Sequence, residues 1–365
     1  MIPIPIEETG LEVRPFAEYR VIVDARTPKE FDEDHIPGAV NFPVVDQDEF
    51  AAVGTLHRTD PHAAYRLGVG YALRRMSTQM DQLLPMLDAT DRVLVYCFRG
   101  GKRSALWADN LRTIGFKVDV VRGGWKRYRR WVLASLQELP KAFQYRVISG
   151  PTGAGKTRLL HALEREGAQV LDLEAMARHR GSLLGDLPGV PQPSQKFFDT
   201  LVFQRLRTFR QDRPVWVEDE SKRIGAVQMS DAMYEAITEG SMVRVDAPMN
   251  ERVRLWHEDY GHFEADLPAM VARLTKLNEL VGNAEIKHWQ ELAKAGQAAE
   301  LFERLMTHHY DPAYARTARR HRPGYDALPV LQLESLSPQA LQVHARSLLA
   351  TGVDLPSVPR AQNGA

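Results

Sequence analysis

Residues 150–157 read Gly-Pro-Thr-Gly-Ala-Gly-Lys-Thr and match the pattern G-x-x-x-x-G-K-[ST] at every defined position. An apolar run at residues 146–149 precedes them and a helical pattern follows, which is the strand–loop–helix context of phosphate-binding loops. The glycines let the backbone wrap an anion, Lys156 can reach outer phosphate oxygens, and Thr157 can hold Mg²⁺. We therefore predict a phosphate site formed by Gly150, Pro151, Thr152, Gly153, Ala154, Gly155, Lys156 and Thr157.

The regular alternation of strand-like and helix-like segments indicates an α/β fold with two parallel sheets. Strand-like runs lie at residues 21–24, 92–96, 117–121, 146–149, 170–173, 214–219 and 242–246. The run at residues 214–219 ends in Glu218 and Asp219, which could form a Walker-B-like element beside the phosphate loop. From about residue 250 to about residue 307 the pattern is mostly helical. The sequence thus predicts a P-loop NTPase-like second domain with a helical C-terminal part.

Composition excludes several classes of protein. The 365 residues carry 47 Lys+Arg and 47 Asp+Glu, and 44% of them are hydrophobic, so there is ample material for a core. No apolar run approaches the roughly 18 residues of a membrane span, and the N-terminus lacks the pattern of a secretory signal. One cysteine can form neither an internal disulfide nor a zinc cluster. We expect a cytoplasmic protein with no membrane association, no metal centre of its own and no tightly bound cofactor.

The single cysteine lies in a loop suited to reactive chemistry. Cys97 follows a strand and precedes a helix, and the loop between them contains two glycines and three cations. Backbone N–H groups at such a helix N-terminus, together with nearby cations, stabilise a thiolate or a bound anion. We predict Cys97 as the catalytic residue of a chalcogen- or anion-binding loop formed by Phe98, Arg99, Gly100, Gly101, Lys102, Arg103 and Ser104.

Two motifs around this loop resemble the signatures of the rhodanese family. Residues 24–31 and 35–43 resemble its opening signature, residues 121–125 resemble its closing signature, and Cys97 falls where the family carries its persulfide-forming cysteine. The resemblance implies a rhodanese-like domain, which we place over residues 1–138. The second run of strands and helices predicts a P-loop domain with a helical extension over residues 139–350, and the composition of residues 351–365 predicts a disordered tail. The C-x5-R spacing of Cys97 and Arg103 is shared with cysteine phosphatases, so a rhodanese-fold phosphatase or sulfurtransferase stays open.

Two clusters of cations could bind RNA. One lies at residues 122–131 and is interleaved with aromatic residues, and the other lies at residues 316–322. Cations hold phosphates, and aromatic or guanidinium groups stack on unpaired bases, although a basic run is often only a solvated helix face. The candidate tRNA contacts are Lys126, Arg127, Arg129, Arg130, Arg316, Arg319 and Arg320.

A phosphate loop begins 53 positions after Cys97, so a rhodanese signature and a phosphate loop lie in one chain. In this combination the chain resembles the tRNA 2-selenouridine synthase family. The resemblance implies an enzyme that replaces sulfur with selenium at position 2 of the wobble 2-thiouridine in the anticodon region of tRNA. It implies selenophosphate and geranyl diphosphate as substrates, an S-geranylated intermediate, Cys97 as the essential cysteine, and contact with a protein that supplies selenophosphate.

Two questions stay open in the sequence. The phosphate loop could bind geranyl diphosphate or ATP, and in the second case the chain could be an ATP-dependent tRNA-binding regulator. Cys97 could carry selenium covalently or only help to bind selenophosphate.

Overall fold

The computed structural model describes residues 8–277, 281–322 and 324–350. Its contacts divide the chain into two compact units, Met1–Glu138 with Pro193–Arg207, and Leu139–Gln192 with Thr208–Ala365. The first unit therefore contains the residues up to Glu138 and a second segment further along the chain. Helix α8 (Gln195–Arg207), which we assigned to the second domain, belongs by its contacts to the first unit. The predicted disordered tail, residues 351–365, lies outside the described residues.

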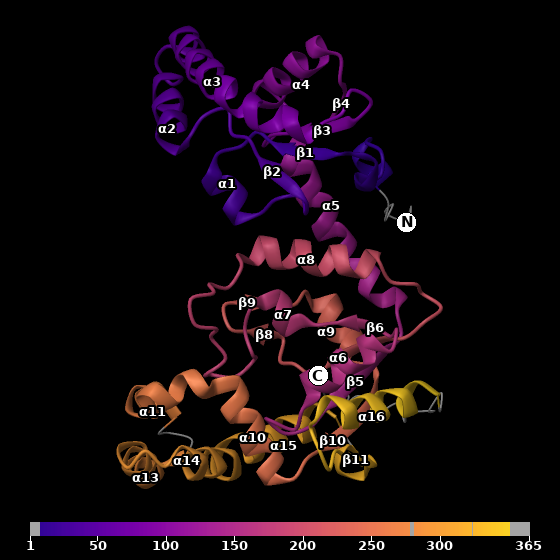
Figure 1. Cartoon of the computed structure of the whole chain (residues 1–365), viewed down its shortest axis with the longest axis vertical. Helices are drawn as coiled ribbons and strands as arrows, with labels where there is room; N and C mark the ends of the chain where they lie inside the picture. The colour runs from indigo at the N-terminus through magenta and orange to yellow at the C-terminus, as the bar shows by residue number, and fades with distance from the viewer. Residues whose placement is uncertain (1–7, 278–280, 323, 351–365) are drawn as a thin grey trace, which may run out of the picture. The chain divides into compact units, whose positions relative to one another are not determined.

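The first unit is built on a four-stranded parallel sheet with strand order β2-β1-β3-β4 (Figure 1). Its strands are β1 (Val21–Asp24), β2 (Ala39–Asn41), β3 (Arg92–Tyr96) and β4 (Lys117–Val120). Its α-helices besides α8 are α1 (Pro28–Glu33), α2 (Gln47–Leu56), α3 (Pro61–Leu83), α4 (Lys102–Ile114) and α5 (Gly124–Glu138). All four residues of β1 are buried, as expected for a parallel strand covered on both faces.

Helix α8 packs against α5 through both aromatic and charged contacts. The rings of Trp131 and Phe203 meet edge to face at 4.7 Å between centroids, and Arg129 forms an ion pair with Asp199. Phe203 is fully buried in this contact. These contacts explain why α8 joins the first unit, although it lies in sequence between strands of the second.

The second unit is built on a five-stranded parallel sheet with strand order β11-β10-β5-β7-β6. Its strands are β5 (Tyr145–Ser149), β6 (Gln169–Leu171), β7 (Val215–Glu218), β10 (Ser241–Asp246) and β11 (Val330–Gln332), and a separate hairpin pairs β8 (Arg223–Ile224) with β9 (Val227–Gln228). Its α-helices are α6 (Lys156–Arg165), α7 (Leu173–Ala177), α9 (Asp231–Thr238), α10 (Met249–Tyr260), α11 (Leu267–Leu274), α13 (Asn283–Lys294), α14 (Ala298–Leu305), α15 (Asp311–His321) and α16 (Pro338–Ala350).

Short helical turns connect several of these elements. A π-helix, η7 (Met306–Tyr310), joins α14 to α15. The 3₁₀ turns are η1 (Glu8–Leu11), η2 (Phe16–Glu18), η3 (Leu84–Met86), η4 (Leu139–Ala142), η5 (Gly261–Asp266), η6 (Thr275–Leu277) and η8 (Tyr325–Ala327). The predicted helical character of residues 250–307 is confirmed over their described part.

Three predicted strands end earlier than expected. We predicted strands over residues 117–121, 170–173 and 214–219, but β4 ends at Val120, β6 at Leu171 and β7 at Glu218. Asp172 instead caps helix α7, because its side chain accepts a hydrogen bond from the backbone N–H of Ala175 at 2.8 Å. A short polar side chain that bonds to the backbone two or three residues ahead favours a helix start over a continued strand.

The order of the second sheet places the phosphate loop at the point where the direction of strand addition across the sheet reverses. The chain runs from β5 to the edge strand β6, returns to β7, and then crosses to β10 and β11 on the other side of β5. In open parallel sheets, ligands bind outside the carboxyl ends of the strands at such a reversal. The loop that follows β5 therefore lies where this fold binds ligands. In the described part of the chain, every helix is too short or too polar to cross a membrane.

Candidate active sites

Cys97 lies at the carboxyl end of β3 with its sulfur at the N-terminus of α4. The backbone N–H of Gly101 donates a hydrogen bond to Sγ at 3.2 Å, and Ser104 Oγ lies 3.2 Å from Sγ. The side chain is only 3% exposed. Free N–H groups and the partial positive charge of a helix N-terminus favour an anion at this place. The predicted environment of the cysteine is therefore present.

The predicted closing signature packs directly on this loop. The N–H groups of Trp125 and Lys126 donate to the carbonyl oxygens of Cys97 at 2.8 Å and Phe98 at 3.0 Å. Gly124 has a φ of +57°, and a Cβ there would lie 2.1 Å from the Cys97 oxygen, so no other residue fits. The glycines at residues 123–124 thus hold the shape of the cysteine loop.

The three cations of the loop have different surroundings. Arg99 and Lys102 are exposed, and Lys102 Nζ lies 3.1 Å from the centre of the Tyr65 ring. Arg103 instead forms an ion pair with Glu30 at 2.6 Å. Burial alone would raise the pKa of Glu30, but the Arg103 guanidinium outweighs it and holds that pKa below its usual value. Arg103 therefore positions α1 rather than facing the sulfur, which disfavours the phosphatase alternative that depends on this arginine.

The basic cluster on α5 divides into exposed and internally paired residues. Lys126 and Arg130 are exposed. Arg127 donates to Glu12 at 2.9 Å, whereas Arg129 pairs with Asp199. The three aromatic side chains between them are buried, namely Trp125, Tyr128 and Trp131. This corrects the expectation of base stacking on this helix: only its exposed cations can contact RNA without rearrangement.

The phosphate loop has the backbone shape that the motif predicts. Gly153 and Gly155 have φ angles of +77° and +79°, which residues other than glycine rarely adopt. Lys156 Nζ donates to the carbonyl oxygens of Gly150 at 3.0 Å and Pro151 at 3.3 Å, so its ammonium group lies over the loop. Backbone N–H groups and a lysine at a helix N-terminus form an anion-binding site.

Two side chains from distant helices hold the loop in place. Tyr314 of α15 accepts a hydrogen bond from the N–H of Gly150 at 2.8 Å and donates to Asp219 at 3.1 Å. Arg252 of α10 donates to the carbonyl oxygen of Thr152 at 2.6 Å and forms an ion pair with Asp311 at 2.6 Å. Both contacts join the phosphate loop to the start of α15. The sequence patterns did not identify these residues, because their partners lie more than 50 positions away.

Glu218 and Asp219, the predicted Walker-B-like pair, have separate roles. Asp219 accepts hydrogen bonds from the hydroxyl groups of Ser149, at 2.8 Å, and Tyr314, and so it helps to hold the loop. Glu218 is 5% exposed, and its Oε1 has no hydrogen-bond partner among the residues that the structure describes. Burial raises the pKa of Glu218, although nearby Lys156 and Thr157 act to lower it. Glu218 is thus the acid with an available oxygen beside the loop.

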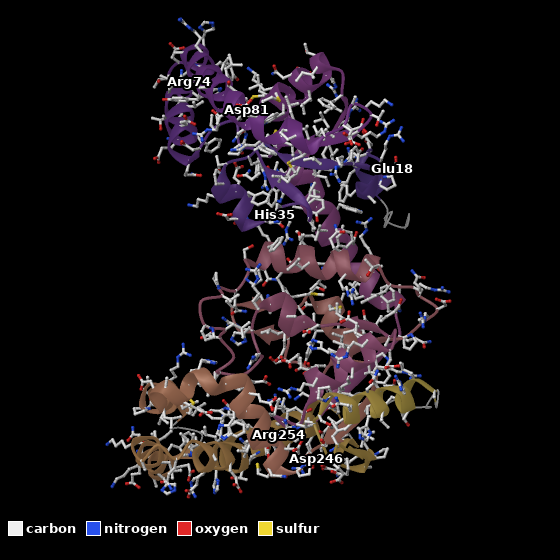
Figure 2. The ribbon with its side chains drawn as sticks, in the orientation of Figure 1. Glu18, His35, Arg74, Asp81, Asp246 and Arg254 are labelled. Atoms are coloured by element: carbon white, nitrogen blue, oxygen red, sulfur yellow. The ribbon has the colours of Figure 1, made fainter. Side chains whose placement is uncertain are left out.

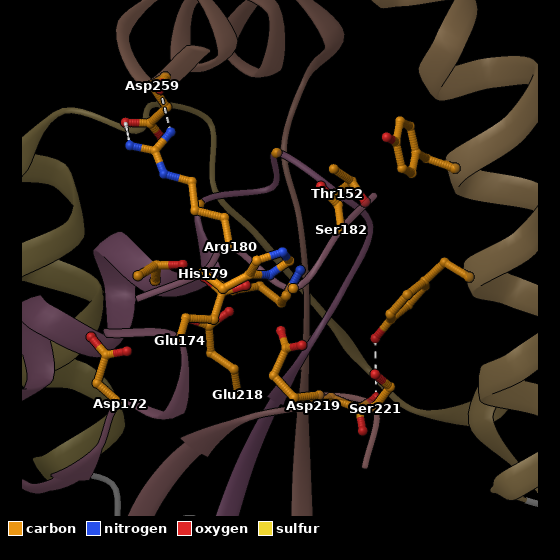
Figure 3. A pocket seen from close by; sticks show the side chains of 18 of the residues that line it. Thr152, Asp172, Glu174, His179, Arg180, Ser182, Glu218, Asp219, Ser221 and Asp259 are labelled. Carbon is orange, nitrogen blue, oxygen red and sulfur yellow. Dashed lines mark hydrogen bonds and ion pairs between the residues drawn. The ribbon is translucent and has the colours of Figure 1, made fainter. Parts of the chain in front are cut away.

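Further acids lie near Glu218 in the same cavity. Burial, together with neighbouring carboxylates, raises the pKa values of Glu174 and Glu220. Figure 3 shows Glu218 and Asp219 below the centre of the view and Arg180 extending to Asp259 at its upper left. Among the described residues, no group of three or more His, Cys, Asp or Glu side chains has an arrangement that could hold a metal ion.

A cavity of about 810 Å³ opens from the phosphate loop within the second unit. Its polar lining includes Lys156, Thr157, His161 and Arg180 in addition to the acids. Another part of its wall is apolar and aromatic, and consists of Leu187, Ile237, Leu255, Trp256, Tyr260, Phe302, Tyr310, Ala313, Tyr314 and Ala318. The cavity therefore combines an anion-binding loop with an apolar surface, which the sequence motifs alone did not predict.

The second basic cluster lies on α15, which also lines this cavity. Ala313, Tyr314, Thr317 and Ala318 face the cavity, whereas Arg316, Arg319 and Arg320 are exposed. Arg319 forms an ion pair with Asp326 at 2.7 Å. Arg316 and Arg320 are thus the candidate RNA contacts of this helix that have no ion pair among the described residues.

Comparison with known proteins identifies both halves of the chain. Residues 13–130 match the rhodanese-like domain, and residues 143–269 match the tRNA 2-selenouridine synthase AAA domain. The two matches confirm the predicted fold class and the order of the two domains.

Several curated tRNA 2-selenouridine synthases are similar to this chain. The tRNA 2-selenouridine synthase of Nitrosomonas europaea is 38% identical over 245 residues, which cover 66% of this chain and 63% of that protein. That of Aeromonas salmonicida is 33% identical over 327 residues, with 80% and 86% covered, and that of Shewanella oneidensis is 28% identical over 366 residues, with 89% and 96% covered. The match spans just under two thirds of the length of the Nitrosomonas relatives. With its cysteine loop, its phosphate loop and these relatives, the chain belongs to the tRNA 2-selenouridine synthase family.

Proposed function

We propose that this chain is a cytoplasmic transferase that replaces sulfur with selenium at position 2 of wobble 2-thiouridine in tRNA. It uses geranyl diphosphate to form an S-geranyl intermediate and selenophosphate as the selenium donor. The observation that carries this proposal is the cavity of about 810 Å³ in which a phosphate loop meets an apolar and aromatic wall. A prenyl diphosphate has the same two parts, an anionic head and an apolar chain.

The geranyl step matches the residues around the loop. The sulfur of 2-thiouridine attacks C1 of geranyl diphosphate, so that a carbon–sulfur bond forms and the carbon–oxygen bond to diphosphate breaks. Lys156 and the backbone N–H groups of the loop stabilise the charge of the departing diphosphate. Thr157 and the unpartnered Oε1 of Glu218 are the groups that would hold Mg²⁺, which would neutralise part of this charge. The apolar wall takes the hydrocarbon chain out of water.

The selenium step is assigned to the Cys97 loop. An S-alkylated sulfur leaves as geranylthiol far more readily than a thiocarbonyl sulfur, so geranylation prepares the carbon at position 2 for a selenium nucleophile. The Gly101 N–H and the helix N-terminus favour an anionic donor or an anionic selenium at Cys97. The selenium of selenophosphate attacks this carbon as geranylthiol leaves, and water then cleaves the phosphorus–selenium bond to release phosphate. Cys97 is proposed to hold the donor for this attack, because a covalent Cys–Se species would need a two-electron oxidant: selenium in selenophosphate is already at the selenide level.

Binding of geranyl diphosphate distinguishes this proposal from the ATP-dependent regulator. We expect geranyl diphosphate to bind at least about tenfold more tightly than inorganic diphosphate, because burial of its apolar chain contributes roughly 25 cal/mol per Å². Calorimetric titration of the whole protein with geranyl diphosphate, inorganic diphosphate and ATP measures this order. Equal affinity for the two diphosphates, with tighter binding of ATP, would support the nucleotide-dependent regulator instead.

The exposed cations beside the Cys97 loop are proposed to bind tRNA phosphates. We expect the double variant Lys126→Ala and Arg130→Ala to weaken cognate and non-cognate tRNA binding alike. The slope of log affinity against log salt should flatten by about 0.9 for each phosphate that the variant no longer neutralises. Lys117→Ala is the matched control, since this exposed lysine begins β4, at the end of the parallel sheet opposite to the Cys97 loop. Unchanged affinity and slope in the double variant would assign RNA binding to other residues, with Arg316 and Arg320 next to be tested.

A further inference from the structure

Exposed aromatic side chains are rare in the described part of the chain. Of the phenylalanine, tyrosine and tryptophan residues that the structure describes, only Phe50 on α2 and Tyr65 on α3 are exposed, at 41% and 43%. The others are buried or half-buried, and those of α5 are all buried. Phe50 and Tyr65 are therefore the two rings of the described chain that are most open to an unpaired base.

Both rings lie beside the Cys97 loop. The Nζ of Lys102 lies 3.1 Å from the centre of the Tyr65 ring, and the guanidinium carbon of Arg103 lies 5.1 Å from the centre of the Phe50 ring. Lys102 and Arg103 are the first two residues of α4, whose N-terminus lies at the Cys97 sulfur. The exposed rings thus contact the residues that directly follow the cysteine loop.

Ion pairs and a hydrogen bond fix the two helices that carry the rings. Arg75 of α3 forms ion pairs with Asp46 at 2.6 Å and Glu49 at 2.8 Å, at the start of α2. The Nε2 of His57, at the end of α2, lies 3.3 Å from the Tyr65 hydroxyl. The rings are therefore presented by a pair of helices joined at two places, and they need little ordering when a ligand binds.

Rings, cations and cysteine loop form a surface suited to unpaired RNA bases. A cation is attracted to the face of an aromatic ring, and each of these rings has a cation on one face and an exposed part that a base can cover. Bases that are splayed out of RNA loops stack on aromatic rings and guanidinium planes, and cations hold the phosphates. Cys97 is only 3% exposed, so a uridine must be held against the loop in order to react there.

We propose that Phe50 and Tyr65 stack on unpaired bases of the tRNA anticodon loop and so hold its wobble uridine at the Cys97 loop. This inference rests on the proposed function and adds a contact for bases to the phosphate contacts proposed for α5. Phosphate contacts release counterions and weaken as salt rises, whereas stacking releases none. The two kinds of contact can therefore be measured separately.

Variants that remove one ring test the proposal. We expect Tyr65→Ala and Phe50→Ala each to weaken binding of an anticodon stem–loop RNA about tenfold, as for the loss of one base–aromatic stack. The slope of log affinity against log salt should stay unchanged, because neither variant removes a cation. Tyr65→Phe keeps the ring, loses only the hydroxyl contact with His57, and should bind like the unchanged protein. Fluorescence anisotropy titration of the whole protein at several salt concentrations measures affinity and slope.

Leu73→Ala is the matched control on the same helix. Leu73 is 54% exposed and lies eight residues, or about 12 Å, beyond Tyr65. It directly precedes Arg74, which Figure 2 labels on α3. A protein partner that covered the exposed side of α3 would contact Leu73 as well as Tyr65, whereas base stacking requires only the ring. We expect Leu73→Ala to bind the RNA like the unchanged protein.

The outcomes separate this inference from the proposed function. Weaker binding with an unchanged salt slope in both ring variants alone supports the inference. Unchanged affinity in the ring variants, or an equal loss in Leu73→Ala, would overturn it. A flattened slope in the ring variants would also overturn it, because they would then act through Lys102 or Arg103. Conversion of 2-thiouridine in tRNA by the unchanged protein is measured in parallel, and its absence would mean that the proposed function itself fails.

Discussion

The Cys97→Ser variant is expected to lose selenium incorporation by at least about a hundredfold while it continues to form S-geranyl-2-thiouridine. An alcohol at this position is a far poorer nucleophile and ligand for selenium than a thiol. The substitution leaves the Gly101 N–H with an acceptor in nearly the same place, so the loop should keep its shape. Nucleoside analysis by mass spectrometry measures both products.

Retained geranylation and retained tRNA affinity are the internal controls for the fold of this variant. Full conversion to selenouridine by Cys97→Ser would show that the thiol takes no part in the reaction. The loop would then serve only as a backbone anion site.

The Lys156→Ala variant is expected to lose geranyl transfer by about 10²–10³-fold, because the departing diphosphate loses its closest cation. Lys156 Nζ donates to the carbonyl oxygens of Gly150 and Pro151 and lies 5.7 Å from the centre of the Tyr314 ring. Its removal leaves in place the hydrogen bond from the Gly150 N–H to Tyr314, which holds the loop. Arg165→Ala is the control, since Arg165 is an exposed cation at the far end of the same helix. Equal geranyl transfer by Lys156→Ala and the control would remove the phosphate loop from this step.

Both loops could be predicted because each is encoded by a short continuous segment. Cys97 follows an apolar strand and precedes a helix, whereas Lys156 begins the helix that follows another apolar strand. Glycines with positive φ angles mark the turns between strand and helix. These local signals depend on few residues and on no distant partner. The parallel-sheet fold follows from the same alternation of strands and helices.

The apolar wall could not be predicted because its parts come together only in the folded chain. Trp256 and Phe302 lie 46 positions apart, and each belongs to a helix whose apolar spacing is that of ordinary core packing. The same reason applies to Arg103, whose partner Glu30 lies 73 positions earlier. A sequence pattern indicates that a charged side chain exists but not which distant group neutralises it.

The assignment of α8 was missed for a related reason. Its sequence predicts an amphipathic helix but contains no signal for the sheet on which it packs. The contacts of Phe203 with Trp131 and of Asp199 with Arg129 decide this, and both partners lie about 70 positions away on α5. The order of strands and helices within a unit is thus easier to infer from sequence than the unit to which a single helix belongs.

The most direct test of the central claim is one reaction carried out without ATP. The unchanged protein, Cys97→Ser and Lys156→Ala are each incubated with 2-thiouridine-containing tRNA, geranyl diphosphate and selenophosphate, and the nucleosides are identified by mass spectrometry. We predict 2-selenouridine from the unchanged protein, accumulated S-geranyl-2-thiouridine from Cys97→Ser, and unreacted 2-thiouridine from Lys156→Ala. Formation of 2-selenouridine only after ATP is added, or its formation by Lys156→Ala without a geranylated intermediate, would contradict the account.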